Sequence, residues 1–312
     1  MQIVRTPSSA RAIARTLARP VGLVPTMGAL HAGHASLVAR AKRENASVVA
    51  SLFVNPLQFG PNEDFERYPR SFEADVALLE ASGVDLLYAP SIERMYPRDF
   101  AARVTVGPIA QDFEGAVRSG HFDGVATVVC KLLHAIEPTL LYVGQKDVQQ
   151  AVVLRALVRD LDFPAHVVVT PTVREPDGLA LSSRNAYLDA AERRAAPSFF
   201  RALGAIAAAV AGGEIQPARA LAAGKSLLQA PLRWEYLAIV DPQTFGPQKP
   251  LMRPSLVIGV ARAGTTRLLD NVPVRGADGI DPIVTPERSR RRSREASTDE
   301  LHDRTARVPP LG

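Results

Sequence analysis

Short apolar runs alternate with amphipathic segments along the first half of the chain. The apolar runs have the length and the Val and Leu content of buried strands, and they lie at 21–25, 47–54, 84–89, 139–143 and 165–170. Segments with apolar residues at helical spacing lie between them, at 29–43, 71–82, 124–136 and 147–160. Strands that alternate with helices predict βαβ units and a mostly parallel sheet, an α/β fold.

The pattern changes near residue 172. Residues 186–230 are rich in Ala and helical in pattern, and 234–240 and 255–261 have the pattern of strands. We therefore expect two domains, a parallel-sheet domain at 1–172 and a smaller α/β domain at 173–274. Residues 275–312 contain Pro, Ser, Arg and mixed charges with few large apolar residues, so we expect a disordered tail to which the pattern assigns no function.

The composition excludes several classes of protein. The chain has 312 residues, of which 46% are hydrophobic, so it can build a core and is not disordered throughout. No stretch of about 18 apolar residues could span a membrane. A single cysteine, Cys130, excludes disulfides and metal sites built on several thiolates, and it fits a reducing compartment. Cys130 lies in an apolar run, so we interpret it as a buried hydrophobic residue rather than a nucleophile.

The formal net charge is +5, and no acidic residue precedes Glu44. A basic start without acids is compatible with a transit peptide. We prefer a strand followed by a packed surface helix, because Ile3 and Val4 suit a strand and Ile13 and Leu17 suit a helix. The candidate chemistry also begins soon after Arg19, which leaves little room for a removable leader.

The first candidate site is the string Pro25-Thr26-Met27-Gly28-Ala29-Leu30-His31-Ala32-Gly33-His34, which joins a strand to a helix. Ligands of parallel sheets bind beyond the carboxyl ends of the strands, and a helix start offers free N–H groups to phosphate. His31 and His34 are three residues apart and share one face of the first turn, and Gly33 would let a phosphate or a flat ring approach the backbone. Zinc is disfavoured because no third ligand is spaced nearby, whereas simple surface histidines remain an alternative.

This string contains the His-x-Gly-His signature of the nucleotidyltransferase superfamily, and as a whole it resembles the pantothenate synthetase (pantoate–β-alanine ligase) family. Six further segments are similar to that family in the same order: Phe53–Phe59, Tyr68–Arg70, Gly120–Val125, Gly144–Gln150, Asp177–Asn185 and Thr266–Asn271. The resemblance covers roughly residues 1–274. It implies a Rossmann-like nucleotidyltransferase domain followed by a smaller C-terminal lid domain.

The resemblance also implies a reaction. Pantoate would be adenylated by ATP with release of pyrophosphate, and β-alanine would then attack the pantoyl adenylate to give pantothenate and AMP. ATP would be a substrate, Mg²⁺ would accompany it without a dedicated set of protein ligands, and the partners would be small molecules. The family further implies a cytoplasmic homodimer. Asp75 is a candidate distant acidic contact to the nucleotide.

The family resemblance assigns site residues one by one. The catalytic groups would be His31, His34, Lys146 and Arg184. The ATP-binding set would be Met27, Gly28, His31, Gly33, His34, Gly144, Lys146, Asp147, Val173, Leu181, Ser182, Ser183 and Arg184. The set for pantoate and β-alanine would be Pro25, Met27, Gln58, Arg118, His121 and Gln150. Gln145 departs from the family, in which Glu is common, and we assign no role to it.

Several of these residues have simpler interpretations. Asp147, at a predicted helix start, is a candidate helix cap, a ribose acceptor or both, and Ser183 is a candidate helix cap as well as a phosphate ligand. Arg118 and His121 lie in a predicted loop before the 124–136 helix, where a plain surface role is the alternative. Lys146 follows a strand, which favours a phosphate contact over a solvated surface lysine.

Two other functions compete with this interpretation. Another nucleotidyltransferase, such as a cytidylyltransferase or a phosphopantetheine adenylyltransferase, would share the two histidines but not Gln58 and Gln150 in this combination. A nucleic-acid-binding protein would use the basic N-terminus and the Arg-rich tail. Only 6% of the residues are aromatic, which leaves few stacking platforms for bases, so we expect no nucleic-acid partner.

Overall fold

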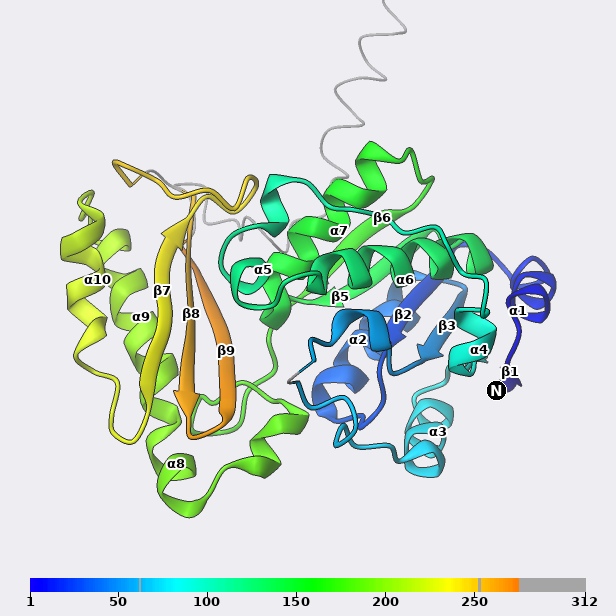
Figure 1. Ribbon diagram of the computed structural model, residues 1–312, viewed down its shortest axis with the longest axis horizontal. Coiled ribbons are helices and arrows are strands. Elements are labelled where there is room, and N and C mark those ends of the chain that lie inside the picture. Colours follow the sequence, from blue (N-terminus) through cyan, green and yellow to red (C-terminus); the bar gives the residue numbers. More distant parts are fainter. Residues whose placement is uncertain (62, 252–253, 275–312) are drawn as a thin grey trace, which may run out of the picture.

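The computed structural model describes residues 1–61, 63–251 and 254–274, and its main element is a six-stranded parallel sheet (Figure 1). The strands lie in the order β1-β4-β3-β2-β5-β6, and every neighbouring pair is parallel. Their bounds are β1 (Gln2–Val4), β2 (Val21–Thr26), β3 (Ser47–Leu52), β4 (Leu86–Tyr88), β5 (Leu140–Gly144) and β6 (His166–Thr170). The predicted α/β class and the five predicted strands are confirmed.

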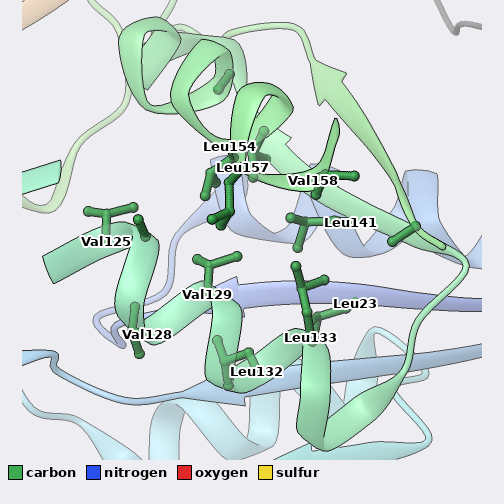
Figure 2. Close-up of a cluster of buried hydrophobic side chains, with 14 of the residues drawn as sticks. Leu23, Val125, Val128, Val129, Leu132, Leu133, Leu141, Leu154, Leu157 and Val158 are labelled. Atoms are coloured by element: carbon green, nitrogen blue, oxygen red, sulfur yellow. The ribbon is translucent and has the colours of Figure 1, made fainter. Parts of the chain in front are cut away.

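Helices cover both faces of this sheet. One face packs against α1 (Pro7–Ala14), α6 (His121–Ile136) and α7 (Val148–Asp160), and the opposite face packs against α2 (Ala32–Glu44) and α3 (Phe72–Ala81). Figure 2 shows side chains of α6 and α7 meeting those of the strands in the first of these layers. The chain leaves β2 toward β3 and later adds β5 on the other side of β2, so the order reverses at β2, where such sheets bind ligands.

Short helical turns interrupt the loops. They are η1 (Pro56–Gln58), α4 (Ile92–Met95), η2 (Pro108–Ala110), α5 (Glu114–Val117), η3 (Gln145–Asp147) and η4 (Ser183–Tyr187). Two helix starts differ from the predictions. The helix expected at 29 begins at Ala32, because Gly28 and Ala29 have φ values of 94° and 51°, which a right-handed helix cannot contain. The helix expected at 124 begins at His121.

The second half of the chain forms a three-stranded antiparallel sheet, β7 (Arg233–Val240), β8 (Ser255–Ala263) and β9 (Thr266–Val274). One face of it packs on the Ala-rich helices α9 (Pro197–Ala211) and α10 (Pro217–Lys225), which follow α8 (Ala190–Ala195). The apolar pattern did not predict the strand β9, although part of it coincides with the family segment Thr266–Asn271. It lies toward the parallel-sheet layer in Figure 1.

The start of the chain forms the predicted strand and packed helix, β1 and α1. Cys130 is half-buried on α6, and burial raises the pKa of its thiol, which does not favour a nucleophile. Within the described residues, none of the helices has the length and apolar character needed to cross a membrane. The disordered tail expected at 275–312 lies outside the described residues.

Candidate active site

A cavity opens where the carboxyl ends of β2 and β5 meet the loops after β3 and β6. It is lined by every predicted site residue except Gly28: Pro25, Met27, His31, Gly33, His34, Gln58, Arg118, His121, Gly144, Lys146, Asp147, Gln150, Val173, Leu181, Ser182, Ser183 and Arg184. The two histidines, the lysine and Arg184 therefore share one cleft, although they come from three distant parts of the sequence. Gly28 lies behind them in the turn.

The turn that carries the histidines is held by a buried carboxylate. Asp75, on α3, accepts the backbone N–H groups of Ala29 at 3.0 Å and Leu30 at 2.8 Å, and it is only 3% exposed. Gly28 adopts a φ of 94°, and a Cβ there would lie 3.0 Å from Asp75 Oδ2. Both carboxylate oxygens hold the turn and Asp75 does not line the cavity, so the expected contact between Asp75 and the nucleotide stays a prediction.

The two histidines cap α2 reciprocally. Nδ1 of His31 accepts the N–H of Gly33 at 3.1 Å, and Nδ1 of His34 accepts the N–H of His31 at 3.3 Å. An acceptor nitrogen carries no proton, so the proton of each neutral ring sits on Nε2. Each ring thus keeps one N–H donor for a ligand. His31 is the capping residue before the first turn rather than a member of it.

Electrostatics keep these rings neutral. Burial, the His31 ring and the Lys146 ammonium lower the pKa of His34 to about 3, and burial and Lys146 lower the pKa of His31 as well. At neutral pH both side chains are N–H donors and not cations. A Cβ at Gly33 would lie 2.8 Å from Cε1 of His31, so this glycine makes room for the His31 ring, and the expected approach of a ligand to its backbone stays a prediction.

Lys146 lies in η3, directly after β5. Its Nζ is 3.3 Å from Oδ1 of Asp147. Burial alone would raise the pKa of Asp147, but the nearby ammonium outweighs it and the pKa is lowered, so this carboxylate is ionised. Asp147 occupies the N-cap position of α7, as predicted, but its side chain makes no capping hydrogen bond to the helix. The ribose role stays a prediction.

The two arginines at the cleft are bound by acids that the sequence reasoning missed. Arg184 donates to both carboxylate oxygens of Asp64, at 3.0 and 2.8 Å, and Arg118 donates to both of Glu63, at 2.8 and 2.6 Å. Adjacent acids in the loop after a predicted strand were the available signal. The residue that caps η4 is Ser182, whose Oγ accepts the N–H of Arg184, and not Ser183.

An amide network lies on the other side of the cleft. Asn55, which is 1% exposed, donates through Nδ2 to Oε1 of Gln58 at 2.9 Å and accepts the hydroxyl of Tyr96 at 2.8 Å. The bond from Asn55 fixes the orientation of the Gln58 amide, and Nε2 of Gln58 lies 3.1 Å from Sδ of Met27. Asn55 falls within the family segment Phe53–Phe59 but is not among the predicted site residues.

His121 is the first residue of α6 and not, as predicted, part of a loop. Its Nδ1 lies 2.8 Å from the carbonyl oxygen of Gln58, and its Nε2 lies 3.1 Å from Nη1 of Arg118. Because a guanidinium only donates and a carbonyl only accepts, Nδ1 carries the proton and Nε2 accepts. Burial and the Arg118 charge lower the pKa of His121 to about 4, so it is a neutral bridge between Arg118 and the Gln58 backbone.

Comparison with known proteins decides the family. The family model described as Pantoate-beta-alanine ligase matches residues 2–273. The chain belongs to this family. Its relatives include pantothenate synthetases from Thermus thermophilus, 53% identical over 275 residues, and from Herpetosiphon aurantiacus, 50% identical over 276 residues. Each alignment covers 87% of this chain and 99% of the relative.

Solved structures support the same membership of the pantoate–β-alanine ligase family. A crystal structure of pantothenate synthetase from Thermus thermophilus superposes with a TM-score of 0.84 at 52% identity, covering 88% of this chain and 100% of that one. The pantoate–β-alanine ligase of Francisella tularensis, crystallised with "Beta-gamma ATP and Beta-alanine", superposes with a TM-score of 0.72 at 34% identity and covers 88% and 98% of the two chains. As a family member the chain is an enzyme, a ligase.

Proposed function

We propose that this cleft condenses pantoate with β-alanine in two steps at the expense of ATP. A carboxylate oxygen of pantoate attacks the α-phosphorus of ATP, and the bond to the β-phosphate breaks to release pyrophosphate. The neutral amine of β-alanine then attacks the acyl carbon of pantoyl adenylate, loses a proton and expels AMP. A free carboxylate is a poor acyl donor, so adenylation supplies the leaving group, and the protein contributes positioning and charge stabilisation.

The histidines and Lys146 would act on the phosphates in the first step. Each imidazole offers an Nε2–H at the amino end of α2, where the helix dipole also favours an anion. Lys146 would add a full positive charge near the α-phosphate, where negative charge grows during attack. Neutral histidines beside one ammonium suit this role, because they donate hydrogen bonds without adding cations that would repel it.

Arg184, Ser182 and Ser183 would bind the β- and γ-phosphates and then release them as pyrophosphate. The guanidinium of Arg184 already binds a carboxylate in a two-pronged geometry, which is also the geometry of an arginine–phosphate contact. We propose that phosphate oxygens take the place of Asp64 on Arg184 when ATP enters. Arg118 would contact the pantoate or β-alanine carboxylate in a similar exchange with Glu63.

Pantoate would lie between Gln58 and Gln150. Amides hydrogen-bond hydroxyl and carboxylate groups without burying a further charge. The observed bond from Asn55 to Gln58 leaves the Gln58 Nε2 group facing the Met27 side of the cavity, which supports a donor role for it. Met27 and Pro25 would form the apolar wall against the dimethyl carbon of pantoate.

The adenosine part would contact the remaining predicted residues, Gly144, Asp147, Val173 and Leu181. Gly144 lines the cavity and would have open space around an added Cβ, which supports close approach of a ligand to its backbone. Asp147 would accept a ribose hydroxyl, since its carboxylate is ionised and does not cap its helix. Gly28 would act indirectly, through the shape of the turn.

We also propose Mg²⁺ as a companion of ATP. No group of three or more His, Cys, Asp or Glu side chains among the described residues could hold a metal ion, so the phosphates and water would supply its ligands.

The family resemblance further supports a cytoplasmic homodimer. The two separate sheets support a boundary between domains 1–172 and 173–274.

The observation that carries this proposal is the convergence of His31, His34, Lys146 and Arg184 on one cavity. The protein should convert ATP, Mg²⁺, D-pantoate and β-alanine to AMP and pantothenate, and it should exchange labelled pyrophosphate into ATP only when pantoate is present. Equal exchange without pantoate would point to a different nucleotidyltransferase. Salt-sensitive binding of nucleic acid with no pantothenate formed would revive the nucleic-acid alternative.

A further inference from the structure

Two consecutive polar residues of β9, Asp270 and Asn271, are buried. They are 2% and 1% exposed and lie in register with Gly259 and Ile258 of β8. Both end the family segment Thr266–Asn271, to which the reaction gives no role. Buried polar side chains are costly unless their hydrogen bonds are satisfied, so their partners indicate what they do.

The hydrogen-bond partners of the Asn271 side chain all belong to the loop that carries Lys146. Its Nδ2 donates to the carbonyl oxygens of Gln145 at 2.8 Å and Lys146 at 3.1 Å, and its Oδ1 accepts from Nε2 of Gln145 at 3.2 Å. Both amide hydrogens and the amide oxygen are therefore used on two successive residues. Asn271 fixes the backbone of the lysine, so that only the side chain of Lys146 remains free to adjust.

The partner of Asp270 lies in the other nucleotide-facing loop. Its carboxylate accepts from Nη2 of Arg174 at 2.9 Å and from Nη1 at 2.5 Å. The same guanidinium donates to the carbonyl of Gly178 at 3.1 Å and lies 3.7 Å from the centre of the Phe200 ring. Arg174 follows Val173 directly, so Asp270 holds the hairpin-like segment 173–181.

The two ends of the segment 173–181 are hydrogen-bonded to each other close to the cavity. The N–H of Leu181 donates to the carbonyl of Val173 at 3.0 Å, and Arg174 forms an isolated β-bridge with Ala180. Successive residues of a strand point to opposite sides, which lets neighbouring positions of β9 serve two different loops. One short piece of β9 thus joins the proposed adenine-facing and phosphate-facing loops.

We propose that Asp270 and Asn271 are positioning residues for the adenylation step. They set the distance between the Lys146 ammonium and the Val173–Leu181 segment, so that ATP bound by one loop presents its α-phosphate to the other. This inference rests on the proposed contact between Lys146 and the phosphates. It gives the C-terminal sheet a positioning part in the adenylation step, beyond that of a cover over the cleft.

The first test is Asn271→Ala, measured by pantoate-dependent pyrophosphate exchange. We expect kcat/KM for ATP to fall by about 10- to 100-fold, since a displacement of about 1 Å in a reacting geometry can cost about 100-fold. The matched control is Ser255→Ala, which removes another buried polar group of the same sheet, bonded to Gln248 at 2.8 Å and outside the cavity lining. The control should keep its kcat/KM within about twofold.

The decisive readout is a double-mutant cycle, because a loss of stability would also lower activity. ATP affinity is measured by calorimetry for Asn271→Ala, Lys146→Ala and the double variant. If Asn271 acts through Lys146, its substitution changes affinity by less than about twofold in the Lys146→Ala background. Independent, multiplying losses would overturn the inference and leave Asn271 with a structural role.

Two further variants keep the test usable if Asn271→Ala does not fold. Asn271→Ser keeps a small polar group but cannot reach both carbonyls, and its effect on ATP affinity should likewise disappear in the Lys146→Ala background. Asp270→Asn keeps the size and weakens the pair with Arg174, so it should raise KM for ATP. Failure of the proposed function itself is seen separately, as pyrophosphate exchange by the parent protein that does not depend on pantoate, whereas unimpaired exchange in Lys146→Ala would contradict only the proposed contact between Lys146 and the phosphates.

Discussion

The two sides of the cleft are built in opposite ways. The histidine turn and the lysine loop are held from behind, by Asp75 on backbone N–H groups and by Asn271 on backbone carbonyls. The Nε2–H groups of the two histidines are left available, and the Lys146 ammonium contacts the carboxylate of its sequence neighbour Asp147 at 3.3 Å. On the arginine side the ligand-facing groups themselves are occupied, because Arg118 and Arg184 are paired with acids of the loop after β3. We call the first the preformed side, and we propose that the second, the exchangeable side, exchanges a protein anion for a substrate anion.

This difference has a physical reason. A half-buried guanidinium without a partner is destabilised by the loss of its hydration. If the carboxylate leaves when phosphate arrives, the guanidinium charge is paired both in the ligand-free protein and with ATP bound. Neutral histidines need no such substitute, since their Nε2–H groups can be solvated by water. The comparison therefore predicts that substitutions on the preformed side lower activity, whereas substitutions of the pairing acids change ATP binding modestly and in the opposite direction.

The largest effect is expected on the preformed side, from Lys146→Ala. Loss of a preorganised positive group at developing negative charge costs about 10²- to 10³-fold in rate. Pantoate-dependent pyrophosphate exchange measures it without the second step. Lys131→Ala is the matched control, because that ammonium lies over the Tyr96 and Phe100 rings and not in the cavity lining. Equal rates for the two variants would remove Lys146 from the chemistry.

A smaller loss is expected from Asp75→Ala. Two partly buried backbone N–H groups would lose their acceptor, which costs up to about 1–3 kcal/mol for each unsatisfied group, and the histidine turn would loosen. We expect kcat/KM for ATP to fall about 10- to 100-fold together with a lower Tm. Glu73→Ala, an exposed acid on the same helix, should change neither quantity. A fall in Tm with full activity would show that the turn does not need Asp75.

A modest gain is expected from Asp64→Asn. The substitution weakens the ion pair on Arg184, and such pairs are worth about 0.2–1 kcal/mol when they are partly exposed, so KM for ATP should fall by up to about fivefold. Glu66→Gln removes an exposed acid of the same loop and is the charge-matched control. A higher KM in Asp64→Asn alone would mean that Asp64 supports ATP binding and does not compete with it.

The elements of the cleft could be predicted further than the contacts that hold it. The strands and the loops after them follow from apolar runs and from local motifs. In the structure these loops place nearly all the predicted site residues at one cavity. Asp75 and Asn271 could not be assigned in this way. Asp75 binds a turn 45 and 46 residues away, and Asn271 binds a loop 125 and 126 residues away. Such partners depend on how elements pack, which no local spacing encodes.

Helix caps and proton positions also depend on local geometry that the sequence pattern does not encode. The choice between Ser182 and Ser183 as the cap of η4 depends on the φ and ψ angles of a single residue. The proton positions on His31, His34 and His121 likewise depend on which neighbouring group donates a hydrogen bond. The sequence therefore predicts these histidines as site residues but not their protonation.

The smallest effects on activity are expected from pH changes near neutrality, because the preformed side holds its histidines neutral. The pKa of His34 is lowered from 6.5 to about 3, so the unfolded chain binds a proton between these values and the folded chain does not. Stability from this group is therefore complete above pH 6.5 and is lost as the pH falls toward 3. The Tm of His34→Gln should decline less than that of the parent protein between about pH 6.5 and about pH 4.

Activity should be nearly insensitive over the neutral range for the same reason. Pyrophosphate exchange needs no β-alanine amine, and neither His34 nor His121, whose pKa is lowered to about 4, changes charge between pH 6 and 8. The exchange rate should vary by less than about twofold there. An inflection near pH 6.5 that disappears in His34→Gln would mean that His34 acts as a cation, and the contrast between neutral histidines on the preformed side and paired guanidinium groups on the exchangeable side would then fail.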